Sequence, residues 1–177
     1  VMYAEVQLDQ VIEKVRGVFA EALELRRITL HTDGLSSIPV FQADKNLLYK
    51  VFYQVIGNAI KYTPDGRSVT VSAHMLGDGK KPEVEVTVKD SGIGIDAQFH
   101  ELVFEKFYQT GEVLLHSSGK TKFKGGGPGL GLAIARGIVN AHRGRIWLES
   151  PGHDEEKCPG TTVFIRLPLN GNHDASA

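Results

Sequence analysis

A carboxylate followed by two glycines is the first group of residues in this sequence that could do chemistry. Asp90 ends an apolar stretch and is followed closely by Gly92 and Gly94. A carboxylate in this place can accept a hydrogen bond from an exocyclic amine such as that of adenine, and the glycines let backbone approach a flat ring closely. Taken alone, the same residues also fit an ordinary Asx turn after a strand.

A second glycine cluster, over residues 125–132, runs straight into a helical pattern. Its central members are Gly127, Gly129 and Gly131. Backbone N–H groups at a helix start point outward, and the helix dipole favours a negative charge there, so the cluster predicts phosphate binding. The plainer reading is a glycine-rich hinge, and the spacing matches neither the dinucleotide fingerprint nor the phosphate loop.

A polar stripe on a predicted helix supplies the third group. Gln54, Asn58 and Lys61 fall at i, i+4 and i+7, so they share one face, and Tyr62 follows them. An amide oxygen such as that of Asn58 is a hard ligand suited to Mg²⁺ held together with phosphate oxygens. Lys61 can neutralise phosphate charge, and Tyr62 could stack on a base. A solvated helix face is the alternative.

Apolar periodicity and turn residues predict the elements that hold these groups. Helices are predicted over residues 9–27, 44–62 and 130–141, the first two capped by Asp9 and Asp44. Strands are predicted over residues 28–32, 38–41, 69–75, 84–89, 145–149 and 162–167, after an extended lead-in at 6–8. Short helical pieces are expected over 96–109, a mobile loop over 110–127 and a disordered tail over 170–177. This order predicts a two-layer α/β sandwich with a mixed, mostly antiparallel sheet covered on one face by about three helices.

The composition fits one globular domain. The chain has 177 residues, of which 41% are hydrophobic and 23% charged. Its net charge of −1 gives no global attraction to nucleic acid or to an anionic membrane. Cys158 is the single cysteine, which suits a reducing, cytoplasmic setting, and no apolar run approaches the roughly 20 residues that cross a bilayer. Because the chain opens at Val1, we expect an excised domain whose parent protein could be anchored in a membrane.

In this order, the elements resemble the catalytic, ATP-binding domain of bacterial sensor histidine kinases. That family belongs, with gyrase, heat-shock chaperones and mismatch-repair ATPases, to the GHKL group with the Bergerat fold. The resemblance covers roughly residues 5–168 of a domain expected at 1–169. It rests on an N box (54–61), a first glycine box (90–94), an F box (104–107) and a second glycine box (127–132). The histidine-kinase subgroup is favoured by residues 58–64, the F box and residues 129–134.

The resemblance implies ATP and Mg²⁺ as cofactors and a role for each site residue. Asp90 would bind the adenine amine with help from Thr161, while Tyr62 would stack near the base. Asn58 would ligate Mg²⁺, and Lys61 would contact phosphate. The remaining nucleotide-binding positions are the adenine-side residues Gly92, Gly94 and Ile95 and, around a lid over about 109–127, Lys124, Gly127, Gly129, Leu130, Gly131 and Leu132.

Two departures from the family pattern bear on activity. Gln54 stands where the family usually has Asn, and where hydrolysing relatives have a Glu that activates water. An amide takes up no proton near neutral pH, which argues against fast hydrolysis but leaves transfer to a positioned nucleophile open. The phosphoacceptor histidine motif is also missing, since neither His31 nor His116 has the required helix or neighbours.

Three functions remain in competition. The first is a kinase domain that transfers the γ-phosphoryl group of Mg²⁺-ATP to a histidine on a phosphoacceptor helical domain of the same or a sister chain, with a response regulator downstream. The second is a non-catalytic, nucleotide-gated interaction module, which Gln54 supports. The third is a serine kinase of the anti-sigma-factor type on the same fold. We favour the first, with Gln54, Asn58 and Lys61 as the catalytic set and the isolated domain as a monomer.

Overall fold

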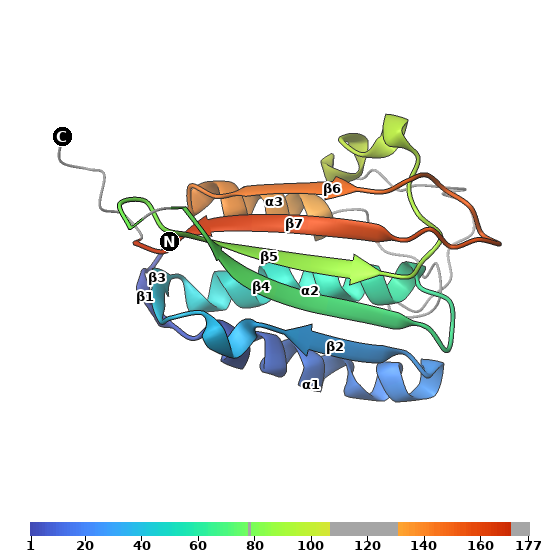
Figure 1. The fold of residues 1–177 in the computed structure, drawn as a ribbon, viewed down its shortest axis with the longest axis horizontal. Helices are drawn as coiled ribbons and strands as arrows, with labels where there is room; N and C mark the ends of the chain where they lie inside the picture. The colour runs from blue at the N-terminus through green and yellow to red at the C-terminus, as the bar shows by residue number, and fades with distance from the viewer. Residues whose placement is uncertain (78, 107–130, 171–177) are drawn as a thin grey trace.

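Helices cover one face of a five-stranded sheet in the computed structural model, which describes residues 1–77, 79–106 and 131–170 (Figure 1). The strand order is β2-β4-β5-β7-β6. The first pair, β2 and β4, is parallel, whereas the other three neighbouring pairs are antiparallel. The predicted mixed, mostly antiparallel sheet is therefore confirmed. Its strands are β2 (Thr29–Asp33), β4 (Ser68–Leu76), β5 (Glu83–Asp90), β6 (Arg145–Glu149) and β7 (Thr161–Pro168).

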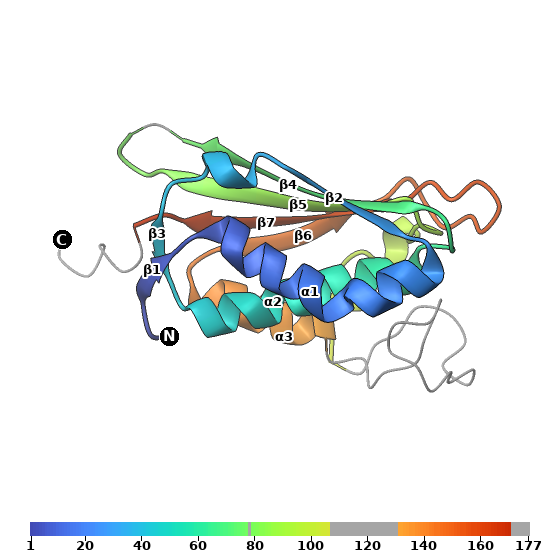
Figure 2. The same ribbon diagram turned by 90° about the horizontal axis from the view of Figure 1, so that it is seen from below.

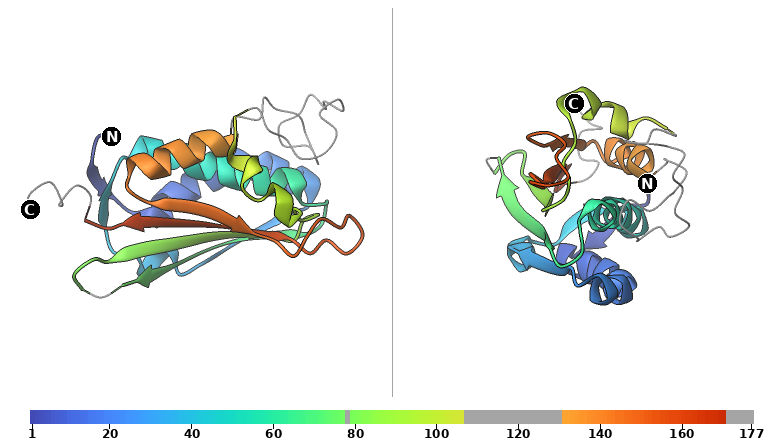
Figure 3. Two further views of the ribbon diagram at one scale, coloured as in Figure 1. Left: turned by 90° about the horizontal axis from the view of Figure 1, so that it is seen from above. Right: turned by 90° about the vertical axis from the view of Figure 1, so that its right-hand side faces the viewer.

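The helical layer consists of α1 (Leu8–Arg26), α2 (Lys45–Tyr62) and α3 (Gly131–Ala141). All three lie on the same side of the sheet, with α2 between α1 and α3 (Figure 2). The end-on view in Figure 3 shows the two layers most clearly. Because α2 packs against both other helices and the sheet, its buried face is broad, and it comprises Leu48, Val51, Phe52, Val55, Ile56, Gly57, Ala59 and Ile60.

Alternating side chains give the sheet one core face and one outer face. On β5, Val84, Val86 and Val88 are buried against the helices. On β6, Ile146 and Leu148 are buried, so Trp147 between them points to the outer face. There its ring stacks on that of Phe164 of β7, with the ring centroids 5.1 Å apart.

Two details at the N-terminal side differ from the expectation. Helix α1 begins at Leu8 rather than after an Asp9 cap; Gln7 is its N-cap, without a side-chain hydrogen bond, and Asp9 lies in the first turn. The strand expected at 38–41 is displaced: a 3₁₀ turn, Leu35–Ser37, precedes β3 (Phe41–Ala43). This strand pairs with β1 (Ala4–Val6) in a separate two-stranded sheet. The extended lead-in expected at 6–8 is thus displaced too, since the strand ends at Val6 and Leu8 already belongs to α1.

The cap of α2 is as predicted, since the Asp44 carboxylate accepts a hydrogen bond from the Leu47 N–H. The short helical pieces are two 3₁₀ turns, Ala97–Phe99 and Leu102–Phe104, and Phe104 is buried in the core. None of the helices in the described part of the chain has the length and apolar character needed to span a membrane.

The ends of two strands and two helices meet at one end of the sandwich, at the right of Figure 1. They are the end of β5, the start of β7, the last turns of α2 and the first turn of α3. Antiparallel pairing of β5 with β7 places Asp90 directly opposite Thr161. These four ends carry the candidate site residues that the structure describes.

Candidate functional site

Asp90 is the buried centre of the site. It is the last residue of β5, and only 7% of its surface is exposed. Its Oδ1 accepts hydrogen bonds from the Gly92 N–H at 2.9 Å and from the Thr161 N–H at 3.1 Å. These two bonds fix the carboxylate between the first glycine box and the start of β7. Among the residues that the structure describes, none donates a hydrogen bond to Oδ2.

Burial changes the acid strength of this carboxyl. It raises the pKa of Asp90 from the ordinary 3.8 to about 7, although the two backbone N–H groups act in the opposite direction. A buried carboxylate is costly without further hydrogen bonds. An amine that donates to Oδ2 would therefore be bound well here, because it would satisfy the oxygen that lacks a donor among the described residues.

The two glycines after Asp90 are required by close contacts within the protein itself. A Cβ on Gly92 would lie 2.4 Å from the carbonyl oxygen of Tyr62, at the end of α2. Gly94 has a φ of +78°, and its Cβ would lie 1.9 Å from the carbonyl oxygen of Gly152. The sequence pattern predicts the close approach of a ligand ring but not this packing role.

The hairpin loop between β6 and β7 braces the same glycine box. The Asp154 N–H donates to the Ile93 carbonyl at 2.7 Å. The hydroxyl of Ser150 accepts from the Ile95 N–H at 3.0 Å and donates to the Gly160 carbonyl at 2.8 Å. Ile95 itself is partly buried against the core. The loop thus ties the backbone on both sides of Asp90, and nothing in its polar composition predicted that.

The last turns of α2 present the polar residues predicted for phosphate and metal. Asn58, Lys61 and Tyr62 are all partly buried. The Lys61 ammonium lies 5.1 Å from the centre of the Tyr62 ring, so the two side chains are neighbours. Ile93 donates its N–H to the Tyr62 carbonyl at 3.3 Å, which joins the end of α2 to the first glycine box.

Gln54 contacts the start of α3. A Cβ built on Gly131 would lie 2.6 Å from the Gln54 Oε1. A glycine at 131 therefore leaves room for the Gln54 side chain, which is longer than the Asn usual in the family. Leu132 follows with its side chain buried in the core, which leaves only its backbone for a ligand. Lys124, Gly127, Gly129, Leu130 and the lid expected at 109–127 lie outside the described residues.

The described residues of the site can hold a metal ion only if a bound nucleotide supplies most of the oxygen atoms around that ion. No group of three or more His, Cys, Asp or Glu side chains gathers into a metal site in the described part of the chain. Asn58 offers one amide oxygen on the face that it shares with Lys61. Mg²⁺ bound with a nucleotide commonly takes one or two protein oxygens, phosphate oxygens and water, so this donor set is compatible with it.

Solved histidine kinase structures share the fold. One is full-length ShkA in complex with AMPPNP, with a TM-score of 0.75, 23% identity and coverage of 100% of this chain and 32% of that one. Another is ThkA in complex with the response regulator TrrA, with a TM-score of 0.70, 23% identity and coverage of 95% and 42%.

Sequence comparison gives the family. A histidine kinase from Formosa agariphila, P4, is 31% identical over 96% of this chain and 12% of its own length. The Escherichia coli kinase BaeS is 34% identical over 94% of this chain and 32% of its own length. The chain thus spans a third or less of these relatives. Residues 43–171 match the family described as histidine kinase-, DNA gyrase B- and HSP90-like ATPases, and the chain belongs to that family.

Proposed function

We propose that this chain is the catalytic domain of a sensor histidine kinase, which binds Mg²⁺-ATP and transfers the γ-phosphoryl group to a histidine on a separate helical domain. The observation that carries the proposal is the buried Asp90, whose Oδ1 is held by Gly92 and Thr161 while Oδ2 has no donor among the described residues. An exocyclic amine is the natural donor to Oδ2, which favours adenine over guanine, because guanine carries a carbonyl at the equivalent ring position.

The other site residues would hold the phosphates beyond the base. Lys61 would neutralise phosphate charge, and the N–H groups of the first turn of α3, from Gly131 and Leu132, would bind phosphate oxygens. Asn58 would hold Mg²⁺ against the phosphates, and that ion would supply charge neutralisation. Positions 124, 127, 129 and 130, with the lid, complete the proposed site.

The transfer itself needs little from this chain beyond positioning. A bond forms between an imidazole nitrogen of the partner histidine and the γ-phosphorus, while the bond to the bridging oxygen breaks and ADP leaves. Gln54 cannot take a proton from water, so it would leave the competing hydrolysis uncatalysed. The family relationship and the AMPPNP complex of ShkA support ATP, and the ThkA–TrrA complex supports a response regulator downstream.

Calorimetric titration of ATP and GTP, with and without Mg²⁺, tests the binding step. We expect Mg²⁺-assisted binding of ATP, much weaker binding of GTP, and loss of ATP binding in Asp90→Asn. Adding the phosphoacceptor domain of the parent protein should then produce acid-labile phosphate on that domain. Acid-stable phosphate would indicate a serine kinase instead, and ATP binding without any transfer would favour a nucleotide-gated interaction module.

A nucleotide-gated interaction module is the second candidate; the relatives, named as histidine kinases, do not favour it, and it rests on Gln54 alone. The Gln54 side chain packs on Gly131, so the N box and the start of α3 are in direct contact. Nucleotide bound between them could alter a docking surface without any transfer. In that case Gln54→Asn, which restores the usual family residue, would create phosphotransfer that the native chain lacks.

A further inference from the structure

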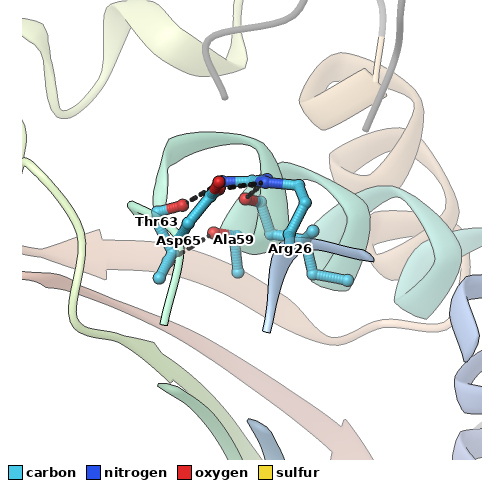
Figure 4. Close-up of polar contacts among 5 residues, drawn as sticks. Arg26, Ala59, Thr63 and Asp65 are labelled. Carbon is cyan, nitrogen blue, oxygen red and sulfur yellow. Dashed lines mark hydrogen bonds and ion pairs between the residues drawn. The ribbon is translucent and has the colours of Figure 1, made fainter. Parts of the chain in front are cut away.

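Arg26 is a buried cation that the proposed chemistry does not use. It is the last residue of α1, and 9% of its surface is exposed. Its guanidinium donates from Nη1 to the Ile60 carbonyl and from Nη2 to the Thr63 carbonyl. Nε donates to the Asp65 carboxylate at 2.9 Å. Figure 4 shows the Arg26 side chain at the end of α2, beside Thr63 and Asp65.

These contacts add to the hydrogen bonding at the end of α2. The last carbonyls of a helix lack partners within the helix. Here the Thr63 hydroxyl donates to the Ala59 carbonyl at 2.7 Å, and the Ile93 N–H donates to the Tyr62 carbonyl at 3.3 Å. Arg26 adds donors to two further carbonyls, that of Ile60, which also accepts from the Thr63 N–H at 3.3 Å, and that of Thr63. A cation is also favourable at a helix C-terminus because of the dipole.

Three features make Arg26 specific to this place. Its backbone carbonyl accepts from the Gly66 N–H at 3.0 Å, so main chain and side chain both hold the turn after α2. The side chain of its acidic partner, Asp65, is 54% exposed, and two further acceptors of the guanidinium are main-chain carbonyls, those of Ile60 and Thr63. A guanidinium presents donors in a planar fork, which an ammonium cannot reproduce.

We propose that Arg26 is a positioning residue for the nucleotide, because it locks the last turn of α2 in the conformation that presents Lys61 and Tyr62. The same turn touches the first glycine box, through the Tyr62 carbonyl and Ile93. A loosened turn would therefore misplace the phosphate contact and the base-stacking residue together. This inference rests on the proposed function, since it names the ligand that the turn serves.

A double-mutant cycle on ATP affinity tests the proposal. Arg26→Lys keeps the positive charge but loses the planar set of N–H donors. We expect ATP to bind about tenfold more weakly, which is roughly 1.4 kcal/mol. In that background Lys61→Ala should cost clearly less affinity than it costs in the native chain, because Lys61 is already misplaced. Additive effects of the two changes would overturn the positioning role, since a general loss of stability does not change the contribution of Lys61.

The matched control is Arg67→Lys, which alters an exposed arginine just beyond the same turn and should leave ATP affinity unchanged. If Arg26→Lys fails to fold, Thr63→Val provides the second test. It removes only the hydroxyl donor to Ala59 and should show the same reduced effect of Lys61→Ala.

Amide hydrogen exchange separates this inference from the proposed function, because it needs no nucleotide. Without ligand, Arg26→Lys should speed exchange of the Thr63 and Ile93 amides, which donate to Ile60 and Tyr62. Unchanged exchange at both would refute the lock, whatever the nucleotide does. If exchange is faster in Arg26→Lys and the native chain binds no ATP, the role of Arg26 in holding the turn stands and the proposed function alone is overturned.

Discussion

Replacing Asp90 with Asn should make the folded protein more stable at pH 8 while removing adenine binding. An Asn side chain has nearly the same shape, and its Oδ1 can still accept from Gly92 and Thr161. It never carries a charge. At pH 8 the native chain holds a buried carboxylate, so the substitution removes a cost that folding otherwise carries.

The sign and size of the effect follow from the raised pKa of Asp90, which is about 7 in the folded protein against an ordinary 3.8. The folded state retains a proton that the unfolded state has released, so stability falls as pH rises between these values. The stabilisation by the neutral carboxyl is full below 3.8 and lost above 7. Each pH unit corresponds to about 1.36 kcal/mol, so the total is about 4 kcal/mol and the loss between pH 5 and pH 8 about 2.5 kcal/mol.

Urea unfolding of both proteins at pH 5 and at pH 8, without nucleotide, measures this effect. The pH dependence from other groups cancels in the difference between the two proteins. We expect the stability of Asp90→Asn relative to the native chain to increase by about 2.5 kcal/mol from pH 5 to pH 8. An equal difference at both values would refute the reasoning, because it would mean that Asp90 does not titrate in this range.

The remaining predictions address the ligand and the packing of the first glycine box. Affinity for adenosine, which has no group titrating in this range, should be about tenfold weaker at pH 6 than at pH 8, because protonated Asp90 cannot accept from the amine; equal calorimetric affinities would contradict this. Asn58→Ala should weaken ATP binding about tenfold with Mg²⁺ and little in EDTA, whereas an equal loss in both would exclude a metal role. Gln54→Glu should raise the rate of phosphate release from ATP by up to about a hundredfold, since a carboxylate can accept a proton from water. An unchanged rate would show that residue 54 does not face the attacking water. Gly92→Ala should lower the free energy of unfolding by about 1–3 kcal/mol, because its Cβ would meet the Tyr62 carbonyl; an unchanged urea midpoint would show that the backbone there yields easily.

Much of the fold could be predicted because its signals are local. Apolar spacing along α2 and a capping Asp44 define that helix within the sequence itself, and alternation defines β5. The pairing of β1 with β3 escaped prediction, since both strands have three residues and their partners are far apart in the chain.

The candidate site was predicted where one short motif supplies the residue. Asp90 accepts from the Gly92 N–H, which is the Asx-turn contact that the motif also allowed, and Thr161 lies beside them through strand pairing. The hydrogen bonds of Ser150 with Ile95 and of Arg26 with Thr63 could not be predicted from the sequence, because each joins residues more than 30 positions apart. The domain limits, 1–169, and the nucleotide roles of the site residues stay predictions.

The position of Trp147 gives the domain a convenient optical probe. It is the single tryptophan of the chain, stacked on Phe164 on the outer face of the sheet. The candidate site lies instead at the ends of β5, β7, α2 and α3. Tryptophan emission should therefore follow disruption of the strand layer while remaining nearly silent when nucleotide binds. Unfolding curves recorded by emission with and without ATP then both report on the strand layer, because the tryptophan does not contact the ligand.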